Sequence, residues 1–112
     1  MKVEVSGNGI AVTPDLREYA RHRLHFLLGR FASRIERVRV RLVDVNGPRG
    51  GIDTHCRVQV LGKGINGLVA AALAVNPETA INEATVRLRR VVRREIERVE
   101  ERRREPRRPS LL

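Results

Sequence analysis

The stretch that decides the fold starts sharply and repeats its apolar residues at helical spacing. Residues 76–104 read NPETAINEATVRLRRVVRREIERVEERRR. Asn76 is a favourable N-cap, Pro77 suits the first helical position because its missing N–H would be unsatisfied there, and Glu78 suits the positive end of the helix dipole. The apolar side chains at three- and four-residue steps are Ile81, Ala84, Leu88, Val92, Ile96 and Val99. We predict an amphipathic helix whose apolar stripe packs against a core.

The same helix carries a row of permanent positive charges. At roughly 100° per residue, the side opposite the apolar stripe carries Arg87, Arg90 and Arg94. Arg98 falls at the edge of this basic side. This helix is therefore predicted both to anchor the fold and to supply half of a binding site.

A strand and a second helix are predicted upstream. Residues 2–6 alternate, with Val3 and Val5 facing inward. Thr13 and Pro14 then begin a helix that reaches about residue 31. Its predicted buried stripe is Leu16, Ala20, Leu24, Leu27 and Phe31. Its predicted exposed side carries Arg17, Arg21, His22, His25 and Arg30.

The clearest strand covers residues 36–45, because apolar and charged residues alternate there. Val38, Val40 and Leu42 face one way. The residues that face the other way are Arg37, Arg39 and Arg41. Neighbouring like charges on a sheet repel one another, so this face favours a polyanionic partner.

An antiparallel hairpin is predicted after a loop at residues 46–51. Its first strand, residues 52–61, places Cys56, Val58 and Val60 inward and His55, Arg57 and Gln59 outward. Residues 62–64 read Gly-Lys-Gly, which suits a tight turn. The second strand, residues 65–74, has no clean period, so a partly helical conformation remains an alternative.

The order of elements predicts an α+β fold. It is a two-layer β-α-β-β-β-α sandwich in which two helices cover one face of a four-stranded sheet. The other face stays wet and basic, with Arg37, Arg39, Arg41, His55 and Arg57. Residues 1–101 form the predicted α+β domain, and residues 102–112 a basic, disordered tail.

Composition points to a polyanion. The 112 residues include 23 Lys and Arg against 13 Asp and Glu, a formal net charge of +10. Nucleic acid is the first candidate partner and an anionic membrane surface the second, although a compositional bias explains any single arginine equally well.

Cys56 stands alone, which excludes an internal disulfide, and no apolar run approaches a membrane span or signal peptide. The sequence therefore predicts a cytoplasmic protein.

Catalytic and metal-binding patterns are weak. His22 and His25 lie three residues apart, but no spaced carboxylate completes a metal site, and a solvated helix face is the better interpretation. A ribonuclease that uses His22 or His25 as a base remains an alternative, but it lacks a clear acid partner. We predict no enzyme activity, metal, cofactor, small-molecule substrate or membrane partner. The aromatic residues are Tyr19, Phe26 and Phe31, and none falls on the basic sheet face, which favours contact with phosphate and folded RNA shape.

Several motifs occur in register with a known family. Residues 12–19 read VTPDLREY, Arg23-Leu24 follow, the strand reads VRVRL, and residues 79–84 read TAINEA before Arg87-Leu88. Over residues 2–100 the chain resembles the ribosome hibernation-promoting factors, also called ribosome-associated inhibitor A or ribosomal subunit interface proteins.

The resemblance implies a bacterial translation inhibitor induced by stress and in stationary phase. Such a protein binds the small ribosomal subunit and its ribosomal RNA in the mRNA/tRNA channel and stabilises idle ribosomes. Matching basic positions are Arg17, Arg23, Arg87, Arg90 and Arg94. Residues 75–79 replace an aromatic step usual in the family, and Phe26 and Gly29 stand where relatives commonly have lysines. The chain ends soon after the second helix, which predicts a short form.

The full set of predicted RNA-binding residues is Arg17, Arg23, Arg37, Arg39, Arg41, Arg57, Arg87, Arg90 and Arg94. Two other functions remain alternatives: a general module for structured or double-stranded RNA, and, less favoured, a small ribonuclease. The oligomeric state stays open.

Overall fold

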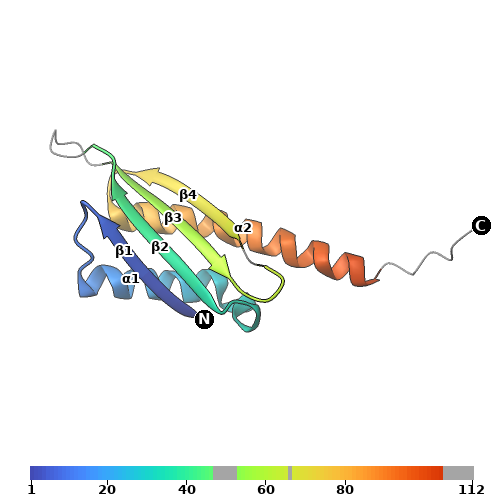
Figure 1. Ribbon diagram of the computed structural model, residues 1–112. Helices are drawn as coiled ribbons and strands as arrows, with labels where there is room; N and C mark the ends of the chain where they lie inside the picture. Colours follow the sequence, from blue (N-terminus) through green and yellow to red (C-terminus); the bar gives the residue numbers. More distant parts are fainter. Residues whose placement is uncertain (47–52, 66, 105–112) are drawn as a thin grey trace, which may run out of the picture.

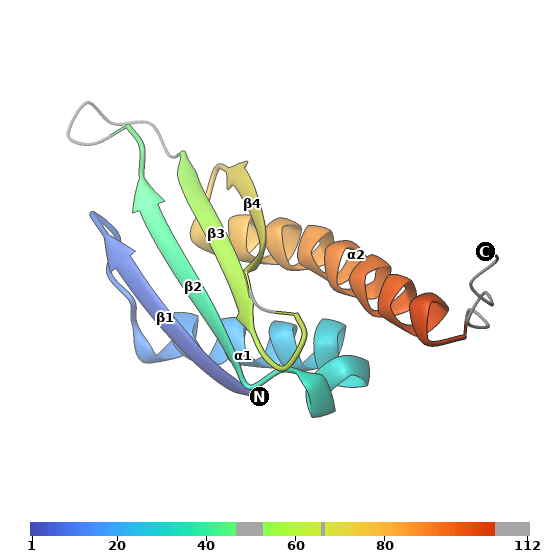
Figure 2. The same ribbon diagram turned by 45° about the vertical axis from the view of Figure 1, so that its right-hand side comes forward.

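The computed structural model describes residues 1–46, 53–65 and 67–104. The elements follow one another as β1 (Lys2–Asn8), α1 (Pro14–Leu28), the 3₁₀ helix η1 (Gly29–Arg34), β2 (Arg37–Asp44), β3 (Thr54–Leu61), β4 (Leu68–Ala74) and α2 (Pro77–Arg104). The strands form one sheet, and α1 and α2 lie side by side on one of its faces (Figures 1 and 2). The predicted two-layer β-α-β-β-β-α sandwich is confirmed.

Strand order in the sheet follows the chain, β1-β2-β3-β4. β1 and β2 are parallel, whereas β2–β3 and β3–β4 are antiparallel. A parallel pair needs a long crossover connection, and α1 supplies it. The register places Val5 beside Val40 and Val40 beside Val58, so the inward side chains form continuous apolar rows under the helices.

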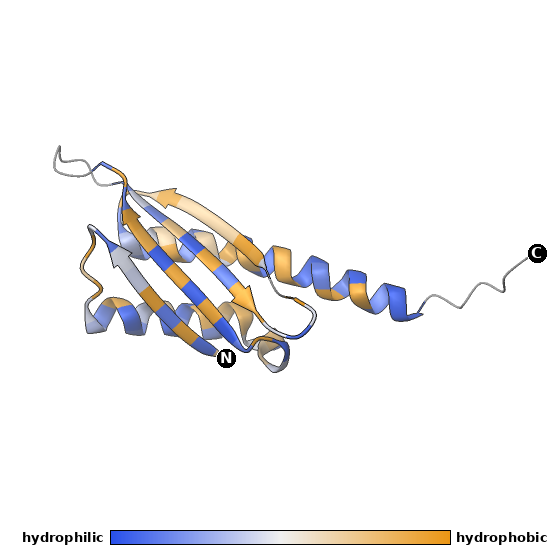
Figure 3. Ribbon diagram, in the orientation of Figure 1, coloured by the Kyte–Doolittle hydropathy of each residue, from blue (hydrophilic) through white to orange (hydrophobic). Residues whose placement is uncertain are grey.

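The core lies between the sheet and the two helices. Val38, Val40 and Leu42 of β2 and Val58 of β3 are at most 1% exposed, and α2 inserts the fully buried Leu88 above them. Figure 3 shows the corresponding alternation of hydropathy along β2 and β3. Cys56 is also fully buried, and burial raises the pKa of its thiol to about 12. This thiol packs as a small apolar group.

Both helices begin as their sequences predict. The Thr13 hydroxyl accepts a hydrogen bond from the Leu16 N–H at 3.1 Å, and the Asn76 side-chain oxygen accepts one from the Thr79 N–H at 2.8 Å. α2 continues through Arg104, so the first three residues assigned to the tail are helical. The rest of that tail, 105–112, lies outside the described residues.

Several predicted boundaries were wrong by a few residues. The first helix ends at Leu28 and tightens into η1, which brings Phe31 into the core before the chain turns to β2. β1 extends two residues further than expected, through Asn8. The predicted loop and the start of the next strand fall largely on residues 47–52, outside the described residues. β3 is assigned from Thr54.

The fourth strand is β structure throughout Leu68–Ala74, so the partly helical alternative was wrong. The sequence of β4 does not alternate cleanly between apolar and polar residues, because alanines occupy both faces of the strand. Ala70 and Ala72 are buried facing α2, which itself presents Ala80 and Ala84, so small residues meet between the two elements. The predicted hairpin is confirmed, but its connection extends beyond Gly64 to Gly67.

Among the described glycines of this connection, Gly62 is the one where a side chain has no room. A Cβ at Gly62 would lie 2.0 Å from the backbone oxygen of Arg34. We expect Gly62→Ala to lower the free energy of unfolding by more than about 2 kcal/mol in urea titrations, because backbone atoms must shift. Gly29→Ala is the control, since its Cβ meets nothing within 4 Å and its φ is −56°. Equal stability of the two variants would contradict the packing described.

Candidate nucleic-acid interface

The solvent side of α2 carries four exposed arginines within two turns of the helix. We define the helix-face cluster as Arg89, Arg90, Arg93 and Arg94, all of which are exposed. The buried residues Leu88 and Val92 alternate with them, so the same two turns fix the core and present the cluster. Guanidinium groups stay charged at physiological pH and match phosphate oxygens with paired donors.

The cluster spreads across the width of α2. Arg93 lies on the side of η1, where it lines a hollow of about 290 Å³ together with Arg30 and Phe31. Arg89 precedes Arg93 by four residues, about one helical turn, and so shares that side. Arg94 faces away from η1, on the side of β4. The cluster therefore presents charge over a broad surface rather than along one line.

Arg87 has a different role from its predicted neighbours Arg90 and Arg94. Its Nη1 donates a hydrogen bond of 2.6 Å to the backbone oxygen of Ala71 in β4. β4 is at the end of the strand order, and unpaired backbone groups of an edge strand attract other chains. Arg87 thus covers part of this edge while its side chain remains exposed.

Arg23 joins the two helices. Its Nε and Nη2 both donate to the side-chain oxygen of Asn82, at 3.0 and 2.6 Å, and its guanidinium carbon lies 5.4 Å from the centre of the Phe26 ring. Arg23 is half-buried, whereas Phe26 is 71% exposed. Arg17, the other predicted residue on α1, is exposed.

We expect Arg23→Lys to lower the free energy of unfolding by about 1–2 kcal/mol, because lysine keeps the charge but lacks the forked donors that hold Asn82. The salt dependence of RNA binding should stay unchanged, since the charge count is the same. Thermal unfolding and binding titrations would measure the two effects separately. Wild-type stability together with weaker RNA binding would instead assign Arg23 to direct RNA contact.

The four predicted arginines of the sheet lie together on its outer face. Arg39, Arg41 and Arg57 are exposed and Arg37 is half-buried. Glu4 of β1 pairs with Arg37 at 3.3 Å and with Arg39 at 3.5 Å. Arg41 stands directly opposite Arg57 in the β2–β3 register. The predicted basic face is therefore present, with one carboxylate among its arginines.

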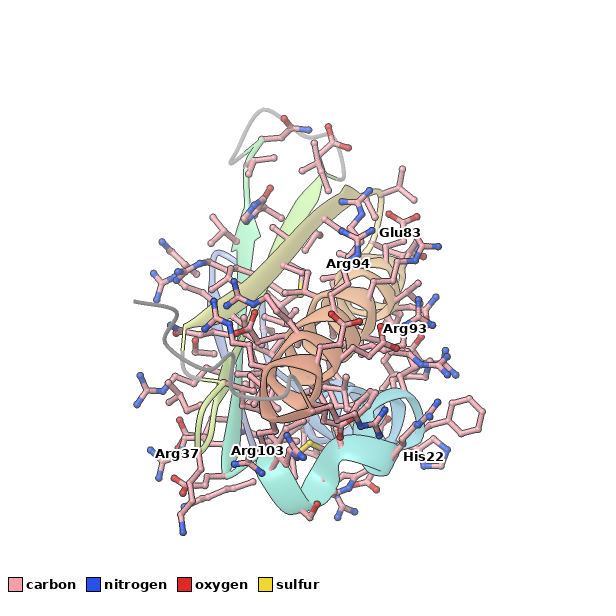
Figure 4. All side chains as sticks on the ribbon, turned by 90° about the vertical axis from the view of Figure 1, so that its right-hand side faces the viewer. His22, Arg37, Glu83, Arg93, Arg94 and Arg103 are labelled. Carbon is pink, nitrogen blue, oxygen red and sulfur yellow. The ribbon has the colours of Figure 1, made fainter. Side chains whose placement is uncertain are left out.

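The two groups of arginines lie on opposite sides of the molecule. In Figure 4, Arg37 lies on one side of the sheet and Arg93 on the other, beyond the helices. The nine residues predicted from sequence consequently fall on two surfaces. The sequence prediction does not include Arg89 and Arg93, which lie in the helix-face cluster. The repeat of arginine pairs at 89–90 and 93–94, one helical turn apart, is the sequence pattern that indicates them.

Other charged side chains are partly neutralised by neighbours one turn away. Arg21 pairs with Glu18 and Arg98 with Glu95, each at 2.7 Å. The hydrogen bond from Arg21 lowers the pKa of the Glu18 carboxyl.

His22 and His25 are exposed, and within the described residues no group of three His, Cys, Asp or Glu could hold a metal. Among those residues, no helix combines the length and apolarity needed to cross a bilayer.

Comparison with known proteins identifies the family. The model for the Sigma 54 modulation protein / S30EA ribosomal protein family matches residues 3–100. A ribosomal subunit interface protein from Coxiella burnetii superimposes with a TM-score of 0.71 at 15% identity, covering 86% of this chain and 99% of that one. The N-terminal domain of Protein Y from Thermus thermophilus gives 0.65 at 21% identity, covering 84% and 98%. No curated protein sequence matches this chain.

The fold and charge define a small α+β protein with two basic surfaces. The chain belongs to the S30EA ribosomal protein family, because the family model covers nearly all of its structured length. This is the family of ribosome hibernation-promoting factors and ribosome-associated inhibitor A, so the resemblance found in the sequence is confirmed. At these identities the two solved structures support the fold alone.

Proposed function

We propose that this protein is a non-enzymatic translation inhibitor that binds the small ribosomal subunit and its ribosomal RNA in the cytoplasm. It occupies the mRNA/tRNA channel and holds idle bacterial ribosomes in an inactive state during stress and stationary phase. The observation that carries the proposal is the family match over residues 3–100, joined to an exposed arginine cluster on a rigid helix.

The chemistry of the helix-face cluster supports RNA as the ligand. Four permanent charges within two turns of helix suit the closely spaced phosphates of folded RNA. The described surfaces offer positive charge and few stacking groups, which favours recognition of RNA shape and backbone over base reading. Arg17 and Arg30 extend the positive charge of this helical layer onto α1 and η1.

An order-of-addition experiment tests the proposed channel site. The protein is added to purified small subunits either before or after a leader mRNA and initiator tRNA fill the channel. We expect binding to empty subunits, inhibition of a reconstituted translation reaction, and strongly reduced binding to filled subunits. Equal binding to empty and filled subunits would contradict the channel site while leaving ribosome association intact.

A general module for double-stranded RNA is the second candidate. It is favoured by a single observation, the two broad arginine surfaces, of which the one on the described strands carries no Phe, Tyr or Trp. Such a module would bind any RNA duplex as tightly as it binds ribosomes.

A further inference from the structure

We propose that the outer sheet face is a second RNA-backbone site, so that one copy of the protein bridges two RNA segments lying on its opposite sides. This inference rests on the proposed function, because it assumes that the helix-face cluster binds RNA. It assigns the sheet arginines a partner distinct from the RNA held by the helices.

The centre of the sheet face forms a shallow basic hollow of about 290 Å³. Its polar and charged lining residues are Glu4, Ser6, Arg39, Arg41, Arg57 and Gln59. Arg41 faces Arg57 directly across the β2–β3 pair, and directly opposed like charges on a sheet are destabilising. An anion placed between these two guanidinium groups would remove that repulsion and accept paired hydrogen bonds from both.

Charge complementarity favours a phosphate backbone as the occupant. Lys2 lies beside Arg37 in the β1–β2 register. Within the described strands, it adds a fifth Lys or Arg to this face, where Glu4 is the one outward carboxylate. The Ser6 hydroxyl and the Gln59 amide provide neutral donors and acceptors of the kind that contact ribose hydroxyls. The described strands carry no Phe, Tyr or Trp, and the one imidazole, His55, lies outside the hollow, so contact is made with the backbone.

The basic area has a clear border. Outward-facing residues of β4 are apolar, and Arg57 stands opposite Ala71 and Gln59 opposite Val69 in the β3–β4 register. The exposed Leu73 continues this apolar strip. The charge is thus confined to β1, β2 and β3, which suits one RNA strand or one groove edge rather than diffuse attraction over the whole face.

Geometry separates the two sites. The helical layer covers the inner face of the sheet, and Figure 4 shows Arg37 and Arg93 pointing away from each other across both layers. A helix layer and a sheet together are about 20 Å thick. A straight RNA helix that contacts one surface therefore cannot reach the other, and simultaneous occupation requires two separate segments.

Native mass spectrometry with a short RNA hairpin in excess tests the inference directly. We expect one protein with two hairpins for the wild type, and one protein with one hairpin for an Arg41→Gln/Arg57→Gln variant. We also expect energy transfer between donor- and acceptor-labelled hairpins, lost in that variant. Thermal unfolding verifies that the variant is folded, which is expected because the substitutions relieve repulsion.

The outcomes separate this inference from the proposed function. A wild-type complex that never exceeds one hairpin would overturn the second site while leaving helix-face binding intact. Two hairpins held only by two copies of the protein would also overturn it, since bridging would then come from self-association. If neither hairpins nor ribosomes bound the protein, the proposed function itself would be wrong. A variant in which the helix-face cluster is replaced by glutamine should still bind one hairpin. Loss of that hairpin when Arg41→Gln/Arg57→Gln is added would support the sheet site independently.

Discussion

Replacing Arg89, Arg90, Arg93 and Arg94 together by glutamine is expected to weaken ribosome binding on the order of a hundredfold at moderate ionic strength. Each phosphate contact contributes about 0.9 to the slope of log affinity against log salt for duplex DNA, so four lost contacts reduce the slope by about 3.6. Because all four side chains are exposed, the fold should remain intact. Pelleting of the variant with ribosomes across a salt series measures both quantities.

Arg21→Gln and Arg98→Gln in one chain provide a control. Arg21 lies on α1 and Arg98 on α2, and each is paired at 2.7 Å with a carboxylate one turn away. Their removal should change affinity much less than removal of the cluster, because only two charges are lost and each guanidinium is already engaged by a carboxylate. A control that loses as much affinity as the cluster variant would show that overall charge, not the helix-face cluster, governs binding.

The largest loss of stability is expected at Leu88. This side chain is fully buried where α2 packs on the sheet, and Leu→Ala changes in cores cost about 2–5 kcal/mol through lost burial and the cavity left behind. Denaturant unfolding of Leu88→Ala should therefore show a midpoint far below that of the wild type. Ribosome binding should fall in parallel, because Leu88 lies between Arg87 and Arg89 on the helix that presents the cluster.

Val86→Ala is the control for that substitution. Val86 lies two residues away on the same helix but is only half-buried. Its truncation should cost less than about 1 kcal/mol. Equal losses for Val86→Ala and Leu88→Ala would contradict the assignment of Leu88 to the core contact.

Elements with strong local signals could be predicted from the sequence. α2 was recognised because its N-cap, its apolar period and its first-turn proline agree, and the structure places the Asn76 cap as expected. β2 is predictable because arginines alternate with apolar residues from Arg37 to Leu42. β4 was ambiguous because its alanines pack against α2 while also occupying the outer face, which removes the contrast that periodicity requires.

Features that depend on distant residues could not be predicted. The parallel pairing of β1 with β2 and the link between Arg23 and Asn82, which are 59 positions apart, depend on the tertiary arrangement. The same is true of Arg87, whose contact with Ala71 exists only because β4 lies beside α2. The separation of the arginines onto opposite faces, in contrast, follows from the predicted layer order, and Figure 4 places Arg37 and Arg93 accordingly.

Cosedimentation with ribosomes in the presence of excess double-stranded RNA tests the central claim most directly. Purified protein is mixed with small subunits, large subunits or whole ribosomes across a salt series, and the competitor is present in molar excess. The account predicts that the protein pellets with small subunits and whole ribosomes despite the competitor, and that binding weakens steeply as salt rises. Release of all the protein to the competitor would contradict the account and would make this chain a general RNA-binding module.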